Sequence, residues 1–247
     1  VGCPGCIESG ITVANTTHGR FFANTVKFGT NEPMMAVTGS VFADTIKGLA
    51  ADPKAKLIDA ATAVPTNALA CTAFPADTFK DSFALISRGS CTFTDKINNA
   101  MAAGAKGVVM VQNNDGQPTS MSNPGTSIPS LMVSLADGRK LAQLAASDKT
   151  TELTLSRFAS RINSAQYTDN MSDSSSRGPN GNNNILKPDL GAPGSSILSA
   201  TSPDGFADKR GFQLMSGTSM ASPHVAGAAA VMKQLYPKWT AVEIKTA

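Results

Sequence analysis

The middle of the chain alternates apolar runs of strand length with segments of helical periodicity, and this alternation restricts the fold more than any other feature. Residues 83–86 and 108–111 are continuous apolar runs of the kind found in buried strands. Residues 151–155 alternate polar and apolar side chains, as a half-buried strand does. Two helical segments separate the three strands. This order of strand, helix, strand, helix, strand within about 75 residues predicts a compact α/β module.

Both helical segments carry a start signal. We expect Thr94 to cap the first helix, which should end near Gly104. Ser134, with Asp137 three residues later, should start the second helix. The apolar positions that define the two helices are Ile97, Ala100, Met101 and Ala105, and then Leu141, Leu144 and Ala145.

The remaining segments are less regular. Residues 11–28 hold apolar runs on both sides of a polar turn at 17–20, which predicts strand, turn, strand. Residues 31–70 show weak periodicity and indicate only some β structure. The segment 163–184 is rich in Asn, Ser, Asp and Gly and is predicted to be loop, and a strand is expected at 197–200.

Composition excludes several classes of protein. The 247 residues allow one large domain or two small ones. With 41% hydrophobic and 16% charged residues, the chain has enough apolar material for a core and is not disordered. No apolar run approaches the roughly 18 residues of a membrane-spanning helix. The net charge of +3 comes without a Lys/Arg cluster, so it indicates neither nucleic acid nor a membrane surface as a partner.

The two ends indicate a piece of a longer protein. The chain starts at Val1 with neither Met nor a signal segment. Thr240 and Glu243 have the spacing of a capping box, yet the helix they would start runs out at Ala247, after about one turn. Because a domain rarely stops one turn into a helix, we expect sequence beyond these ends.

The four cysteines fall into two pairs. Cys3 and Cys6 form a CxxC motif, and no second CxxC or His pair completes a zinc site. A zinc site, a local disulfide and two free thiols therefore remain open for this pair. Cys71 and Cys91 flank a candidate strand. A disulfide between them would stabilise the fold by about 3 kcal/mol and would imply an oxidising compartment.

Residues 216–227 combine small side chains, a serine at a helix start and a proline. We expect Pro223 in the first turn of a helix that ends near Pro237. Ser219 then stands at the helix N-terminus, where free N–H groups favour a developing negative charge. Ser219 is either a nucleophile with its own backbone N–H as an oxyanion donor, or a structural cap. The apolar face of this helix would carry Val225, Ala228, Ala229, Met232 and Leu235.

Three ordered motifs resemble the subtilisin-like serine proteases. The segment 217–224, Gly-Thr-Ser-Met-Ala-Ser-Pro-His, is similar to the active-serine signature of that family at all eight positions. Ser-Ser-Arg-Gly-Pro at 175–179 and Lys-Pro-Asp at 187–189, followed by Ala-Pro-Gly at 192–194, resemble segments just upstream of it. The resemblance implies a secreted serine endopeptidase with an α/β, parallel-sheet catalytic domain. In it Ser219 would be the nucleophile, and its backbone N–H would contribute to the oxyanion hole.

The middle module resembles the protease-associated (PA) domain that is often inserted in this family. The resemblance implies a catalytic-domain segment at 1–30, an insertion at 31–157 with a core at about 65–157, and a second catalytic part at 158–247. It also implies a Cys71–Cys91 disulfide. The matching positions are Cys71, Arg88, Gly89, Cys91, Asp95, Lys96 and residues 102–105.

The resemblance also implies partners for Ser219 that the 247 residues lack. The triad Asp and His precede the serine in subtilases, and no Asp-Thr-Gly, Asp-Ser-Gly or His-Gly-Thr motif is present. The Asn-x-Gly segment of the oxyanion asparagine, which would lie just before the part matched by residues 1–14, is missing too. By the same resemblance His224 and Asp189 are structural, and His18 lies in a surface turn. We therefore expect this piece to be inactive by itself, with the N-terminal half of the same chain as its partner.

Other expectations follow from the resemblance. Substrates would be proteins or peptides, and nucleic acid would not be a partner. Calcium is possible, because many subtilases bind it, but no ligands are assignable. Two rival functions remain: a pseudoprotease that binds proteins through its PA domain, and a different serine hydrolase such as an esterase. The esterase fits poorly, because Ser219 lies in Gly-Thr-Ser-Met-Ala and not in Gly-x-Ser-x-Gly.

Overall fold

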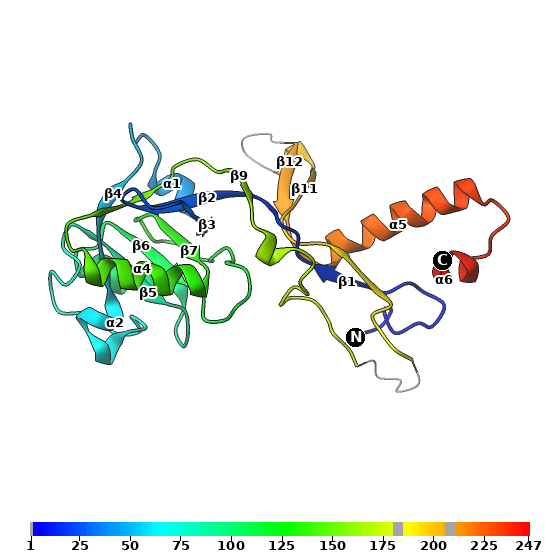
Figure 1. The fold of residues 1–247 in the computed structure, drawn as a ribbon, viewed down its shortest axis with the longest axis horizontal. Helices are drawn as coiled ribbons and strands as arrows, with labels where there is room; N and C mark the ends of the chain where they lie inside the picture. The colour runs from blue at the N-terminus through cyan, green and yellow to red at the C-terminus, as the bar shows by residue number, and fades with distance from the viewer. Residues whose placement is uncertain (1, 180–184, 206–210) are drawn as a thin grey trace. The chain divides into compact units, whose positions relative to one another are not determined.

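The chain divides into two compact units (Figure 1). Unit 1 comprises Val1–Phe21 and Asn163–Ala247, and unit 2 comprises Phe22–Ile162. Unit 2 is therefore inserted within the sequence of unit 1. This computed structural model describes residues 2–179, 185–205 and 211–247. The Asn tract of the predicted loop, 180–184, lies outside the described residues.

Unit 2 is built on a mixed sheet with the strand order β3-β7-β6-β5-β4-β8-β2-β9. The neighbours β4, β5, β6 and β7 run parallel, whereas β8 and β3 pair antiparallel at the two sides of this group. Because β3 also pairs with β2, the sheet curls back on itself. The strands are β2 (Arg20–Phe28), β3 (Met34–Thr38), β4 (Lys54–Asp59), β5 (Ser82–Ser87), β6 (Gly107–Val111), β7 (Ser130–Val133), β8 (Glu152–Leu155) and β9 (Ser160–Asn163).

Two helices cover opposite faces of the parallel strands in unit 2. Successive side chains of β6 alternate between two buried clusters, as the pleat requires. Val109 packs in the cluster that contains Leu141 of α4 (Leu135–Ser147), which lies across the sheet in Figure 1. Met110 packs in the cluster that contains Ile97 of α3 (Phe93–Ala102). The short helices of this unit are α1 (Phe42–Thr45), α2 (Ala60–Ala63) and the 3-10 helix η1 (Pro65–Asn67).

Most local predictions for unit 2 are confirmed, and one cap is wrong. The expected strands at 83–86, 108–111 and 151–155 are β5, β6 and β8. Ser134 Oγ accepts the N–H of Asp137 at 3.0 Å, as predicted for the start of α4. The cap of α3, however, is Thr92 and not Thr94, because Thr92 Oγ1 accepts the N–H of Asp95 at 3.1 Å. The stretch 31–70, where only some β structure was expected, contains β3 and β4, whereas β7 and β9 were not predicted.

Unit 1 contains two small sheets and two helices. The predicted strands on both sides of the turn at 17–20 exist, but they do not pair with each other. β1 pairs in parallel with β10, whereas β2 joins the sheet of unit 2. The strand expected at 197–200 is β11, antiparallel to β12. The elements are β1 (Val13–Thr16), η2 (Ala165–Tyr167), β10 (Leu190–Pro193), β11 (Ile197–Ala200), η3 (Pro203–Gly205), β12 (Phe212–Met215), α5 (Thr218–Leu235) and α6 (Ala241–Thr246).

The helix α5 begins earlier than predicted and buries less. It starts at Thr218, so Pro223 lies in its second turn, not its first. Because proline has no N–H, the carbonyl of Ser219 lacks its usual partner four residues on. Of the predicted apolar face, Val225, Ala229 and Met232 are half-buried and none is fully buried, and Leu235 is 66% exposed. The capping box of α6 is present, with the N–H of Thr240 donating to Glu243 Oε2 at 2.6 Å. Of the helices described, none is long and apolar enough to cross a membrane.

Candidate active site

Ser219 is presented at the start of α5. It is the second residue of the helix, and its side chain is exposed. The N–H groups of a first helical turn have no acceptor in their own helix, and the helix dipole adds a partial positive charge there. Gly217, just before the helix, has φ 156° and ψ 167°, a conformation that is open mainly to glycine. This arrangement offers a hydroxyl and an N–H that can stabilise a negative charge beside it.

The start of α5 is fixed by close backbone contacts with the β1–β10 pair. Gly194 follows β10, and its N–H donates to Thr16 O at 2.9 Å while its carbonyl accepts from Gly217 N at 2.8 Å. A Cβ on Gly194 would lie 2.5 Å from Asn15 Oδ1 and 2.6 Å from Gly217 O, so only glycine fits. The Ala-Pro-Gly motif therefore holds the turn that precedes Ser219. Sequence reasoning did not assign this role to Gly194.

A buried asparagine joins the other motifs to this turn. Asn15 is fully buried, and its N–H donates to Ser175 Oγ at 2.9 Å. Ser195 Oγ donates to Asn15 Oδ1 at 3.3 Å. Ser175 of the 175–179 motif and Ser195, the residue after the 192–194 motif, thus both bond to one residue of β1. The sequence offered no signal for this contact.

Neither histidine is hydrogen-bonded to Ser219 within the described part of the chain. His224 Nδ1 lies 2.8 Å from the carbonyl oxygen of Met220, on its own helix. His18 Nδ1 accepts the N–H of Arg20 at 3.1 Å, and the ring stacks on Phe21 with the centroids 5.7 Å apart. The described residues of unit 1 therefore present a serine without a paired base.

Asp189 is occupied by a structural network. Its Oδ2 accepts from the buried Lys187 Nζ and from the N–H of Thr12, both at 2.6 Å, and Lys245 Nζ lies 3.1 Å from Oδ1. Burial works against ionisation of Asp189, but the hydrogen bonds from Lys187, Thr12 and Lys245 outweigh it and lower its pKa. The carboxylate joins the N-terminal segment to α6, and the same network supports β10.

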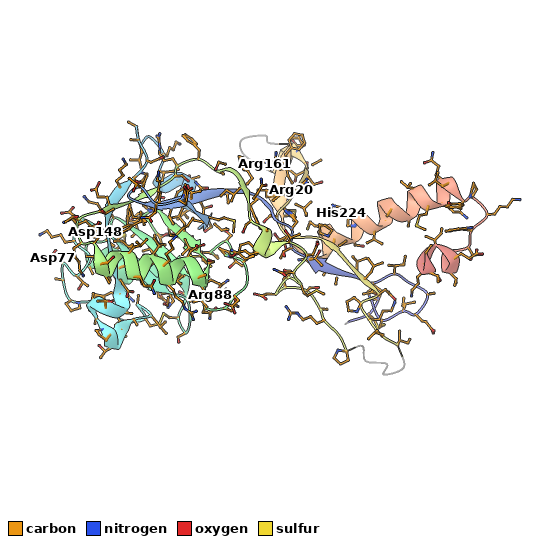
Figure 2. All side chains as sticks on the ribbon, viewed as in Figure 1. Arg20, Asp77, Arg88, Asp148, Arg161 and His224 are labelled. Atoms are coloured by element: carbon orange, nitrogen blue, oxygen red, sulfur yellow. A yellow bond between two sulfur atoms is a disulfide. The ribbon has the colours of Figure 1, made fainter. Side chains whose placement is uncertain are left out.

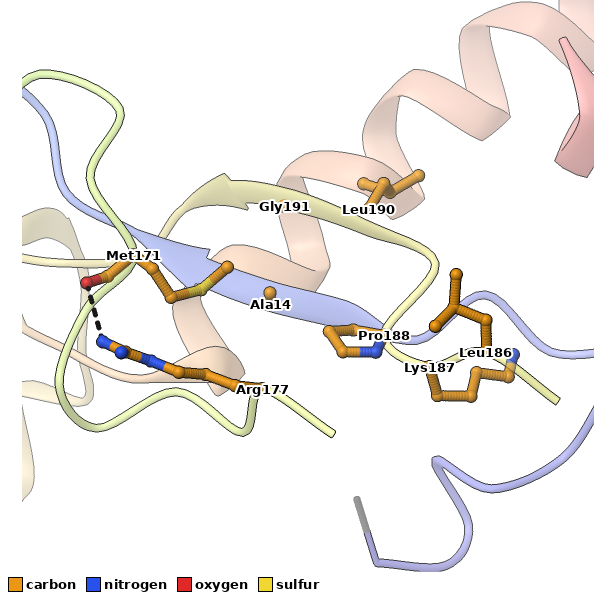
Figure 3. Close-up of a pocket in the computed structure, with 8 residues that line it drawn as sticks. All are labelled: Ala14, Met171, Arg177, Leu186, Lys187, Pro188, Leu190 and Gly191. Carbon is orange, nitrogen blue, oxygen red and sulfur yellow. Dashed lines mark hydrogen bonds between the residues drawn. The ribbon is translucent and has the colours of Figure 1, made fainter. Parts of the chain in front are cut away.

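A hollow of about 440 Å³ in unit 1 is lined in part by residues of β1 and β10 (Figure 3). Within it, Arg177 donates to the carbonyl of Met171 at 3.4 Å. Ser219 does not line the hollow, so it is not the place where a substrate carbonyl would meet the serine. The lining residues are Ala14, Met171, Arg177, Leu186, Lys187, Pro188, Leu190 and Gly191.

The cysteines form two disulfides, Cys3–Cys6 and Cys71–Cys91. The second is the pairing that the resemblance implied. For the first, the structure selects the disulfide from the three possibilities that the residues left open. The described residues contain no group of three or more His, Cys, Asp or Glu side chains that could hold a metal ion.

Sequence comparisons find extracellular and subtilisin-like proteases similar to this chain. The chain is 42% identical over 167 residues to the minor extracellular protease Vpr of Bacillus subtilis, which covers 66% of this chain and 20% of Vpr. It is 39% identical over 158 residues to the PII-type proteinase of Lactococcus lactis subsp. cremoris, covering 63% of the chain and 8% of that proteinase. The subtilisin-like protease SBT3.10 of Arabidopsis thaliana is 31% identical over 240 residues, 96% of this chain and 30% of that protein. The chain thus spans less than a third of each of these relatives.

Solved structures are more distant. A zinc aminopeptidase from Bacillus subtilis aligns with 60% of this chain and 35% of its own, at 22% identity and a TM-score of 0.38. The psychrophilic subtilisin-like protease Apa1 from Pseudoalteromonas sp. AS-11 aligns with 94% of this chain and 43% of its own, at 16% identity and a TM-score of 0.40. The sequence model of the subtilase family, peptidase S8, matches residues 9–247. The chain therefore belongs to the subtilase family.

Proposed function

We propose that this chain carries the nucleophile of a secreted subtilisin-like serine endopeptidase. The observation that supports this most directly is the exposed Ser219 in the first turn of α5, held there by Gly217 and Gly194. Family membership supports serine peptidase chemistry in general. Protein or peptide substrates follow from that chemistry.

The proposed reaction is acyl transfer. Ser219 Oγ attacks the carbonyl carbon of the scissile peptide bond, and its proton passes to a histidine base. The carbonyl oxygen becomes negative in the tetrahedral intermediate, and the N–H of Ser219 donates to it. The histidine returns the proton to the departing amine, which leaves an ester on Ser219. Water then attacks that ester by the same route and releases the acid.

The base and its orienting carboxylate belong, in this proposal, to a part of the protein outside these 247 residues. His18 and His224 are both engaged with backbone groups of their own segments. Asp189 is held by two lysines. We therefore expect the 247-residue chain to lack peptidase activity until it is joined to the N-terminal half, which would also supply the oxyanion asparagine.

We assign unit 2 as a protease-associated insertion. Its α/β module and the Cys71–Cys91 disulfide support this assignment. The contact boundaries of the unit, Phe22–Ile162, lie slightly outside the 31–157 expected from the sequence. Secretion is supported by the two disulfides, which persist in oxidising compartments. Calcium remains an implication of family membership alone.

The test compares three proteins: the full-length parent, its Ser219→Ala variant and the 247-residue chain. The parent should cleave a casein substrate and react with a fluorophosphonate serine-hydrolase probe. Ser219→Ala should reduce kcat by about a million-fold, the loss seen when the serine of subtilisin is removed. Ser199→Ala, at an exposed serine of β11, is the control and should leave activity unchanged.

Three results would contradict the proposal. Undiminished cleavage by Ser219→Ala would show that another group is the nucleophile. A parent that neither cleaves protein nor reacts with the probe would support the rival function, a pseudoprotease that binds proteins. Peptidase activity of the 247-residue chain alone would disprove the proposal that the histidine base lies outside these residues.

A further inference from the structure

The parallel strands of unit 2 bring several polar side chains to one edge of the sheet. Arg88 directly follows β5, and Gln112 directly follows β6. Because β5 and β6 are parallel neighbours, the residues after their carboxyl ends meet. In α/β sheets this edge is where ligands are usually bound. Arg88 is labelled in Figure 2 among the side chains of unit 2.

The guanidinium of Arg88 is held in place by neutral groups. Its Nη1 donates to Gln112 Oε1 at 2.7 Å, and its Cζ lies 5.7 Å from the centroid of the Phe93 ring. Gln112 is 1% exposed, and its Nε2 donates to Gln117 O at 3.0 Å. The amide that positions Arg88 is thus itself fixed by the following loop. Such a preorganised guanidinium loses little entropy when it binds a planar anion.

The charge of Arg88 has no counter-ion within the described part of the chain. Arg157, the other half-buried arginine of unit 2, pairs with Asp52 Oδ1 at 3.2 Å. No described carboxylate forms such a pair with Arg88. Partial burial of a cation is costly unless an anion accompanies it. Only one of the five N–H groups of Arg88 has an acceptor among the described side chains, so the others are available.

The surroundings favour a ligand with a carboxylate and an apolar part. Gln117 Nε2 in the adjoining loop is buried and has no acceptor among the described residues. Phe93 and Leu69 are half-buried apolar side chains beside Arg88 and Gly89. The nearest helix start offers no rival carboxylate, since Asp95 accepts from Thr92 Oγ1 at 2.7 Å within its own cap.

We propose that Arg88 binds the carboxylate of a peptide, whose neighbouring apolar residue packs on Phe93 and Leu69. Gln112 positions the guanidinium, and two parallel N–H groups of Arg88 bond the two carboxylate oxygens. The peptide as ligand rests on the proposed endopeptidase function, whereas the carboxylate follows from the geometry of unit 2. Either an acidic side chain or a C-terminal carboxylate supplies this chemistry.

The test measures binding to the 247-residue chain by fluorescence anisotropy. The probe is a fluorescein-labelled octapeptide of alternating leucine and glutamate with a free C-terminus. One arm replaces every glutamate by glutamine, and another amidates the C-terminus. We expect saturable binding of the probe and a Kd about tenfold weaker in the arm that removes the recognised carboxylate. No saturable binding, or equal binding of all three peptides, would overturn the proposal.

Variants locate the site. Arg88→Gln should weaken Kd by about tenfold or more, whereas the charge-matched control Arg161→Gln, at an exposed position of β9, should not change it. Gln112→Glu keeps Arg88 but supplies a carboxylate within the chain, so it should compete with the peptide and weaken binding to a similar extent. The site would be disproved if Arg88→Gln and Gln112→Glu both kept full affinity for the peptide. Equal losses of affinity in Arg88→Gln and Arg161→Gln would also disprove it. Because the readout is binding, absence of proteolysis would not affect it.

Discussion

The two units of this chain differ in how completely they bury their apolar side chains. Unit 2 encloses two clusters in which Leu131, Met132 and Leu153 are fully buried. In unit 1, Leu198 and Phe212 are each 67% exposed, and Val231 is 56% exposed. Both sheets of unit 1 have two strands, a size that is marginal in isolation. Unit 2 therefore contains its whole core, whereas the surface of unit 1 resembles one layer of a larger packing.

Core truncation should give the largest contrast between the units. Leu131→Ala removes a fully buried side chain of β7 and should lower the free energy of unfolding by about 3 kcal/mol. Leu198→Ala, on the exposed face of β11, should change it by no more than about 0.5 kcal/mol. Urea unfolding of the 247-residue chain, followed by far-UV circular dichroism, measures both. Equal losses would show that unit 1 has a core of its own.

The two disulfides provide a second contrast. Replacing Cys71 and Cys91 by serine opens a loop of sequence separation 20 in unit 2 and should cost about 3 kcal/mol in the chain-entropy model. Replacing Cys3 and Cys6, with a separation of 3 in unit 1, should cost only about 1.5 kcal/mol. Thermal unfolding of both double variants tests the order. A larger loss from the Cys3–Cys6 variant would reverse the comparison.

Acid should loosen unit 1 through Asp189. Because its folded pKa is lowered, the carboxylate stabilises the fold above its usual pKa of about 4, and this stability is lost as the pH falls through the folded value. Asp189→Asn should therefore flatten the acid side of the stability–pH curve. Asp173→Asn, from an exposed pair 3.8 Å from Arg177, is the control and should leave the curve unchanged. Trp239 fluorescence reports on unit 1, which contains the single tryptophan of the chain.

The exposed side of α5 should give the smallest change in stability. Val231→Ser on the exposed side of α5 should alter the stability of the 247-residue chain by about 0.5 kcal/mol or less. If the N-terminal half covers α5 in the full-length parent, the same variant should cost about 1.5–3 kcal/mol there, because the valine is then buried. Paired denaturation curves of the two proteins give both values. A small cost in both would mean that α5 stays uncovered.

The fold of unit 2 was predictable where short-range bonds decide it. The start of α4 follows from the Ser134 hydroxyl and the backbone N–H of Asp137, three residues apart. The start of α3 was misplaced because two threonines lie close together, and only Thr92 has an acidic residue three positions later. β7 was missed because a run of four residues after an irregular loop is too short to show a period.

The position of Ser219 at a helix start was predictable, but the contacts that hold this start in place were not. Small residues before Ser219 and helical periodicity after it indicate a serine at a helix start. The first turn was misplaced, since the helix begins where Gly217 turns and Ala221 packs against Gly194. That packing, like the bonds of Asn15, joins segments distant in the sequence. No local pattern carries such information.

The two ends of unit 2, where the chain enters and leaves it, lie side by side. β2 and β9 are neighbours in one sheet, and Ser164 N donates to Gly19 O at 2.8 Å just beyond them. If unit 2 were an unstructured loop, closing it would cost unit 1 about 4 kcal/mol of entropy from the length of the loop alone. Because the ends of the folded unit already adjoin, unit 1 has to close a connection no longer than a hairpin. A change of length inside unit 2 can therefore leave the Ser164–Gly19 bond and the register of β1 against β10 as they are.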